Sequence, residues 1–134
     1  IAGCSKSKVT QNSKVDFRDS LVGNYLCTKH YYTYRWGSDS VTQTVHGFVT
    51  DTVLGTVIIN VSKIGHNDTL LDINNSVYSY SSFNNASAEF FSESITGVDN
   101  HANFVYGNDS IWFNEYTSFQ WTYQKEYYYT GHKQ

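Results

Sequence analysis

Apolar and polar residues alternate along most of this 134-residue chain, and this alternation constrains its fold more than any other feature. In segment 119–124, for example, every aromatic residue is followed by Gln or Thr. A period of two residues places successive side chains on opposite faces of a β-strand. The composition agrees, because the chain has 12 Tyr, 8 Phe and no Pro, and few of the residues that favour helices. The chain is therefore predicted to be all-β.

The alternation divides the chain into about eight strands joined by short connections. The predicted ranges are 23–36, 41–50, 53–64, 68–74, 76–82, 86–92, 102–106 and 110–130, the last with a break near residues 115–117. Turn-forming residues at 65–68 and 107–109 separate neighbouring strands. Short connections favour an antiparallel meander, and about eight such strands can close into a barrel. A sandwich of two sheets is the alternative.

The first 20 residues differ from the rest of the chain. The chain begins with Ile-Ala-Gly-Cys at positions 1–4, which resembles the lipobox of bacterial lipoproteins, so Cys4 is predicted to carry the lipid. Residues 5–20 are polar and without a period, as in a flexible tether, and residues 21–134 are predicted to form one barrel domain. A disulfide between Cys4 and Cys27 is the alternative. The resemblance implies export and attachment to the outer membrane, with Lys6 and Lys8 leaving the leaflet undecided.

Short motifs within the domain resemble those of lipocalin and calycin barrels. Gly-Asn-Tyr at 23–25 is similar to the Gly-x-aromatic start of the first lipocalin strand. Segments 55–63, 109–113 and 129–133 are similar to the middle and the end of small calycin-like lipoproteins of Bacteroidota. The resemblance implies an eight-stranded barrel, export and lipidation. It implies no particular ligand, because such folds host many functions.

The residue types that carry chemistry show no catalytic pattern. The five His residues are not spaced as metal ligands, the carboxylates form no evident pair, and Cys27 has no His motif beside it. We therefore expect no catalytic residue, no metal and no cofactor, and we predict that the protein is not an enzyme. With a net charge of −3 and no basic stripe, we also expect no binding to nucleic acid.

Aromatic residues crowd the first and last predicted strands, which become neighbours if a barrel closes. Consecutive Tyr residues must point to both faces of a strand, so some of these rings lie outside the barrel. The predicted aromatic binding surface consists of Tyr32, Tyr34, Trp36 and Tyr128. Exposed rings of this kind suit stacking on sugars or a protein interface. The alternative is that Tyr side chains fill the barrel and keep only their hydroxyls in water.

Asp followed by Ser or Thr and then an aliphatic residue occurs five times. This triplet resembles the O-glycosylation sequon of exported Bacteroidota proteins. The hydroxyl residues that would carry glycans are Ser20, Ser40, Thr52, Thr69 and Ser110. The alternative is that Asp-Ser or Asp-Thr simply joins a turn to a strand.

These observations predict a non-enzymatic outer-membrane lipoprotein that acts as an accessory subunit of a larger envelope complex. Its partners would be the membrane, through the lipid on Cys4, and an outer-membrane protein. The alternative is a lipocalin-like barrel that binds a small molecule or a glycan. A small glycan hydrolase and an enzyme inhibitor are further alternatives.

Overall fold

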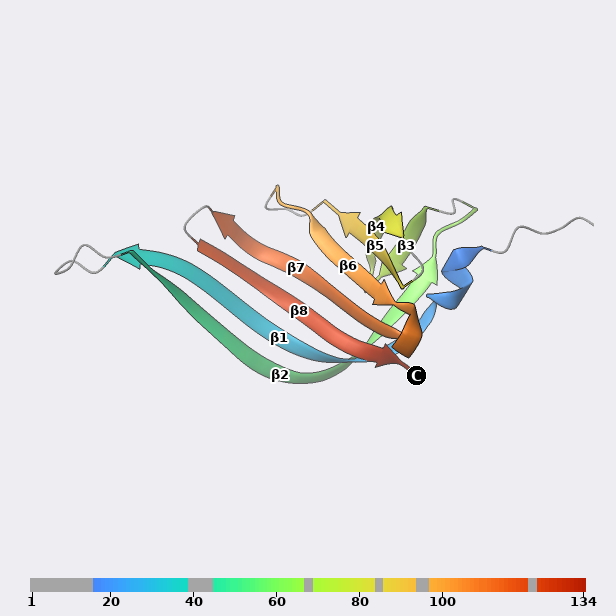
Figure 1. The fold of residues 1–134 in the computed structure, drawn as a ribbon, viewed down its shortest axis with the longest axis horizontal. Coiled ribbons are helices and arrows are strands. Elements are labelled where there is room, and N and C mark those ends of the chain that lie inside the picture. Colours follow the sequence, from blue (N-terminus) through green and yellow to red (C-terminus); the bar gives the residue numbers. More distant parts are fainter. Residues whose placement is uncertain (1–15, 39–44, 67–68, 84–85, 94–96, 121–122) are drawn as a thin grey trace, which may run out of the picture.

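The computed structural model describes residues 16–38, 45–66, 69–83, 86–93, 97–120 and 123–134. Eight antiparallel strands follow one another in chain order and close into a ring, with β1 hydrogen-bonded to β8 (Figure 1). The strands are β1 (Gly23–Ser38), β2 (Val45–Lys63), β3 (Leu70–Ile73), β4 (Ser76–Phe83), β5 (Ser87–Ser92), β6 (Asn100–Val105), β7 (Ser110–Gln120) and β8 (Tyr123–Lys133). The predicted all-β meander is confirmed, and its strands form one closed sheet rather than a two-sheet sandwich.

The predicted number of strands, eight, is right, although two of the predicted divisions are wrong. One error counts a single strand as two and the other counts two strands as one, so the total is unchanged. The described part of the predicted strand 41–50 and the predicted strand 53–64 are a single strand, β2, which continues through Asp51 and Thr52. Residues 41–44 lie outside the described residues. The predicted strand 110–130 is two strands, β7 and β8. The predicted break near residues 115–117 is a shift of register between Tyr116 and Ser118, with both strands continuing past it. Such a bulge bends a strand without ending it.

The ring is uneven, because its strands differ greatly in length. β1 pairs with β2 and with β8 over most of its 16 residues. β2 has 19 residues, but only Val61, Ser62 and Lys63 pair with β3. β2, β1, β8 and β7 therefore run on past the short strands as a four-stranded sheet, which extends from one side of the barrel (Figure 1). We call the face of this sheet that continues the barrel interior the inner face, and the opposite one the outer face.

Aromatic side chains fill the barrel. The largest fully buried ones are Tyr25, Tyr78, Phe90, Phe104 and Phe113. Phe104 meets both Tyr25 and Phe90 edge to face, with ring centroids 5.9 and 5.7 Å apart. Burying each such side chain stabilises the fold by roughly 2 kcal/mol. The interior is thus packed with the protein's own rings. The buried Tyr25 and Tyr78 do not keep their hydroxyls in water, because these groups donate to the backbone carbonyls of Leu21 and Asn114.

A short 3-10 helix, η1 (Phe17–Ser20), packs against the barrel ahead of β1. The Phe17 ring lies 5.5 Å from the ring of Tyr80 and 6.4 Å from that of Phe90. Arg18 is only 2% exposed, and its guanidinium is 2.7 Å from the Asp16 carboxylate and donates to a backbone carbonyl of β3. This hydrogen-bonded pair lets a charged side chain be buried. η1 therefore belongs to the packed domain.

The sequence prediction placed the start of the domain at residue 21, after a tether over residues 1–20. The structure adds Phe17–Ser20 to the folded part of the chain. The remainder of the predicted tether, residues 1–15, lies outside the described residues.

A tight turn joins β3 to β4. Asn74 and Asn75 have φ angles of 54° and 65°, and Ile73 pairs directly with Ser76. Two consecutive residues in the left-handed region are typical of a type I′ hairpin, and Asn adopts this conformation at low cost. The Asp72 carboxylate accepts a hydrogen bond from the Asn75 N–H.

The predicted turn at residues 107–109 is also present, where η2 (Tyr106–Asn108) leads into β7.

Gly131 of β8 lies tightly against the backbone of β1. A Cβ atom there would lie 2.6 Å from Cys27 Cα and closer still to the Leu26 carbonyl oxygen. We predict that Gly131→Ala lowers the free energy of unfolding by about 2 kcal/mol, because backbone atoms have no room to yield. Gly107→Ala is the control, because nothing lies within 4 Å of that position, and it should change stability by less than about 0.5 kcal/mol. Urea denaturation measures both, and equal stabilities would contradict the packing described.

Candidate functional site

Along most of its length, one edge of β2 is not paired with any described strand. On one side, β2 pairs with β1 from Val45 onward. On the other side, the described residues place β3 only against Val61–Lys63. Val45–Ile59 therefore presents an edge that no described strand covers. The backbone groups on such an edge can form hydrogen bonds with a further strand.

Apolar side chains accompany this edge. Val49, Val53, Leu54 and Ile58 are each more than half exposed. Leu54 has no partner in β1, because the register shifts there and leaves it as a bulge. Soluble proteins commonly protect free edges with Lys or Pro. Segment 45–60 has neither residue, and Asp51 is its only Asp, Glu, Lys or Arg.

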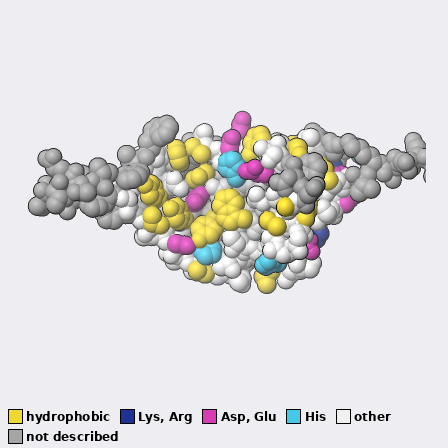
Figure 2. Space-filling view, in the orientation of Figure 1, with side chains coloured by type: hydrophobic (Ala, Val, Ile, Leu, Met, Phe, Trp, Pro, Cys, Tyr) yellow, Lys and Arg dark blue, Asp and Glu magenta, His cyan; other side chains and the backbone are white. Residues whose placement is uncertain are grey.

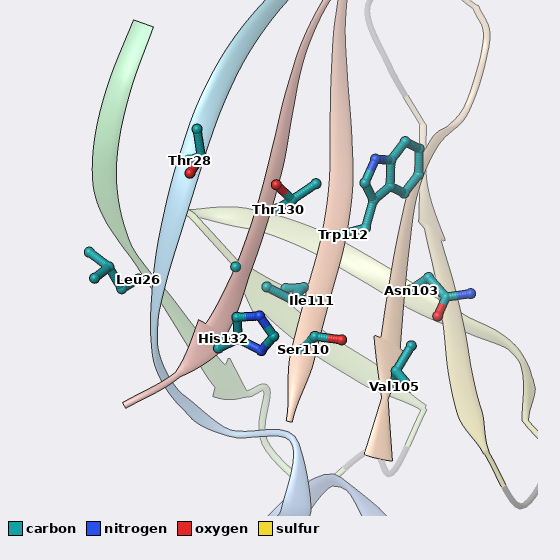
Figure 3. Close-up of a pocket in the computed structure, with 10 residues that line it drawn as sticks. Leu26, Thr28, Asn103, Val105, Ser110, Ile111, Trp112, Thr130 and His132 are labelled. Carbon is teal, nitrogen blue, oxygen red and sulfur yellow. The ribbon is translucent and has the colours of Figure 1, made fainter. Parts of the chain in front are cut away.

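A groove of about 690 Å³ lies on the outer face beside this edge (Figure 3). It crosses β1, β8, β7 and β6, and Figure 3 shows Leu26 on one side of it and Trp112 on the other. These two side chains are 46% and 40% exposed. Leu26 also pairs with Ile58 of β2, so the apolar surface continues from the groove to the free edge. Figure 2 shows hydrophobic side chains gathered over the long strands.

The structure brings together two residues of the predicted aromatic surface. Tyr128 of β8 and Tyr32 of β1 lie on the outer face, with ring centroids 6.5 Å apart. Tyr34 follows on the same face of β1, and its ring packs over Gly47. The side chain of Trp36 is outside the described residues. All three described Tyr residues are half-buried.

A hydrogen-bonded cluster that the sequence did not reveal holds Tyr128 in place. His30 stacks on Tyr128 with centroids 4.3 Å apart and rings 13° from parallel. The Tyr128 hydroxyl donates to Asp51 over 2.6 Å, and His30 Nδ1 lies 3.0 Å from the other carboxylate oxygen. One face of Tyr128 is therefore occupied by His30 and its hydroxyl by Asp51. The cluster joins β1, β2 and β8, which gives it a structural role.

The electrostatics of the cluster oppose a catalytic role for Tyr128. The hydrogen bonds from Tyr128 and His30 lower the pKa of Asp51 below its ordinary value. Burial, together with the bond to Asp51, raises the pKa of Tyr128 to about 12. A phenol with such a pKa stays protonated near neutral pH and is a poor nucleophile.

Glu126 is a buried carboxylate close to this surface. It is 9% exposed, pairs with Tyr32 on one side and Tyr116 on the other, and accepts a 2.7 Å hydrogen bond from Asn114. Burial raises its pKa, and the bond from Asn114 opposes that shift only in part. Asn114 also accepts a hydrogen bond from the His101 backbone N–H, at the start of β6. The Glu126–Asn114 pair thus lies where the short strands leave the long sheet.

The remaining predicted sites are dispersed. Cys4 and Ser40 lie outside the described residues. Among the possible glycan acceptors, Ser20, Thr52 and Thr69 are exposed, whereas Ser110 is half-buried. Ser110 begins β7 after a turn, as the alternative reading of the triplet proposes, whereas Thr52 lies in the middle of β2.

Cys27 faces the barrel core and is fully buried. Burial raises the pKa of its thiol to about 11, so the reactive thiolate is scarce at neutral pH. Among the described residues, no three His, Cys, Asp or Glu side chains are grouped to hold a metal ion. The same residues include no helix with the length and apolar character needed to cross a membrane.

The chain matches no known family model, no curated protein and no solved structure. The eight-stranded meander is therefore established by the structure itself, without a relative to assign the family.

The buried carboxylate gives a pH-dependent prediction. A carboxyl group whose pKa is raised by folding destabilises the folded state once the pH exceeds its ordinary value of about 4. We predict that Glu126→Gln, which keeps an acceptor for Asn114, raises the thermal midpoint by a few degrees at pH 7. The gain should shrink as the pH falls and vanish below about pH 4, where Glu126 is protonated in both states. A thermal midpoint that is lowered at pH 7 would show that the charge stabilises the fold.

Proposed function

We propose that this chain is a non-enzymatic, lipid-anchored subunit of a larger envelope assembly, in which a partner protein adds a strand to the free edge of β2. In this proposal Cys4 carries the lipid, as in small calycin-like lipoproteins, and the barrel sits at the outer membrane. The observation that carries the proposal is the edge of β2, with Val45–Ile59 left uncovered by the described strands.

Addition of a strand to a sheet edge is a common mode of protein recognition. The backbone supplies hydrogen bonds, and side chains next to the edge supply apolar contact. Val49, Val53 and Leu54 offer this contact on β2, and Leu26 and Trp112 extend it across the outer groove. Exposed apolar residues that adjoin one another are more typical of an interface than of a free surface.

The chemistry of the described residues favours binding over catalysis. The barrel interior is filled by aromatic rings and the thiol of Cys27 is buried. On the outer face, the cluster of Tyr128, His30 and Asp51 is hydrogen-bonded within itself. The proposal therefore places the function on the surface of the long strands.

Photo-crosslinking in the native envelope tests the partner. A benzoyl-phenylalanine at Val53, which is 61% exposed on the free edge, should give an adduct of one defined mass. The same probe at Val77, which is 54% exposed on β4 within the barrel wall, is the control and should give none. Val53→Lys should dissociate the native complex and Val77→Lys should not, because a charge blocks edge pairing. A monomer in mild detergent, with adducts at neither site, would refute the proposal.

The lipid anchor has its own test. The intact mass of the protein extracted from membranes should include acyl chains, and Cys4→Ser should release the protein from the membrane. Several chains on one Cys give stable attachment, whereas a single chain gives marginal binding. A native protein without acyl mass would remove the anchor from the proposal and leave the binding edge.

A further inference from the structure

The inner face of the long sheet carries a second groove, on the side opposite the outer groove. Its volume is about 380 Å³. It is lined by Tyr31, Thr33, Arg35, Thr50, Tyr123 and Lys125. The side chains of this lining are two phenols, two hydroxyls and two cations, so the groove offers aromatic rings together with positive charge.

Cations and rings alternate across the two central strands of the groove. Arg35 of β1 stands opposite Tyr123 of β8, and Thr33 stands opposite Lys125. The Lys125 ammonium lies 5.2 Å from the centre of the Tyr123 ring. A ligand that lies along the strands would therefore meet positive charge and a phenol ring in turn.

The same pattern continues toward the barrel. The ring centroids of Tyr31 and Tyr127 lie 5.3 Å apart, and the Lys29 ammonium is 4.3 Å from the centre of the Tyr127 ring. From Tyr31 to Arg35 the groove extends about 13 Å along the strand, at about 3.3 Å per residue. This length accommodates a few linked sugar rings.

The described carboxylates of the neighbouring strands lie away from the groove. By strand alternation, Asp51 and Glu126 belong to the outer face, and both are bonded there. Glu115 belongs to the inner face but lies toward the barrel, within hydrogen-bond distance of the Tyr129 hydroxyl and Asn74. Among the residues that the structure describes, the lining of the groove contains no acidic side chain.

We propose that this groove binds an acidic saccharide chain. Arg35 and Lys125 would contact its carboxylate or sulfate groups, and Tyr31 and Tyr123 would lie against its rings. Charge-assisted hydrogen bonds select an anion, and phenol rings offer an apolar face together with a polar edge. This site lies on the opposite face from the predicted aromatic surface and does not depend on the partner proposed for β2.

The charges favour a saccharide over a nucleic acid. The chain has a net charge of −3, so attraction for an anion has to arise locally. Two cations in the lining suit spaced acidic groups, whereas nucleic-acid grooves usually neutralise many successive phosphates. The groove is built on paired strands, and the Thr33 and Thr50 hydroxyls are hydrogen-bonded to each other across them. Sites on paired strands are more precisely held than sites on loops.

Titration of the whole protein with a galacturonic acid tetrasaccharide tests the proposal, with a neutral galactose tetrasaccharide as the matched ligand. Binding is followed by calorimetry and by amide shifts of β1 and β8 at low and high salt. The acidic chain should bind, more weakly at high salt, and the neutral chain should not. Arg35→Gln and Lys125→Gln should each weaken binding by about fivefold or more, and Lys125→Arg should retain it.

Lys63→Gln is the control for the loss of one positive charge. Lys63 contacts Asp19 and Asp16 near η1, away from the groove, so its replacement should change binding by less than about twofold. Equal losses for Lys63→Gln and Lys125→Gln would overturn the proposal, because the attraction would then be general. Three other outcomes would also overturn the proposal. The neutral chain could bind as tightly as the acidic one, or a single-stranded oligonucleotide could bind more tightly. Inorganic sulfate at equal concentration could fully displace the acidic chain.

Discussion

The structure depends on the pairing of β1 with a strand on each side along most of its length. β8 and β2 are held against it from the barrel into the long sheet, and Gly131 allows β8 to approach the β1 backbone at Cys27. Because β2 reaches β3 only through Val61–Lys63, the same strands form a closed barrel at one end and an open sheet at the other. The barrel supplies the aromatic core that stabilises the fold. The open sheet supplies two accessible faces and a free edge.

The sequence predicted the fold class because alternation is a local property of each strand. It misplaced boundaries where local signals conflict with pairing. Asp51 and Thr52 look like a turn, but Asp51 is bonded to His30 and Tyr128, which keeps β2 extended through them. The division of segment 110–130 was missed because aromatic residues alternate on both sides of it. Arg18 also escaped prediction, since nothing in a polar run shows that its guanidinium will be buried beside Asp16.

Part of the candidate site was predictable and part was not. The prediction that the Tyr-rich first and last strands become neighbours in a closed barrel is confirmed, and the rings of Tyr32 and Tyr128 lie near each other across them. The sequence could not show that His30 stacks on the Tyr128 ring or that Asp51 accepts a hydrogen bond from its hydroxyl, because the three residues come from separate strands. The free edge of β2 was equally hidden. Whether a strand is covered depends on the lengths of its neighbours, which its own sequence does not record.

Residue-by-residue amide hydrogen exchange along β2, measured in the isolated protein, distinguishes a free edge of β2 from one that another strand covers. If the edge is free, the amides of Val61 and Ser62 should be protected, because Val61 pairs with Gly23 of β1 and Ser62 with Asp72 of β3. Within Val45–Ile59, amides that point toward β1 should be protected and those that point to the free edge should exchange rapidly. Uniform protection of every amide from Val45 to Lys63 would contradict the free edge of β2, since a further strand would then already cover that edge.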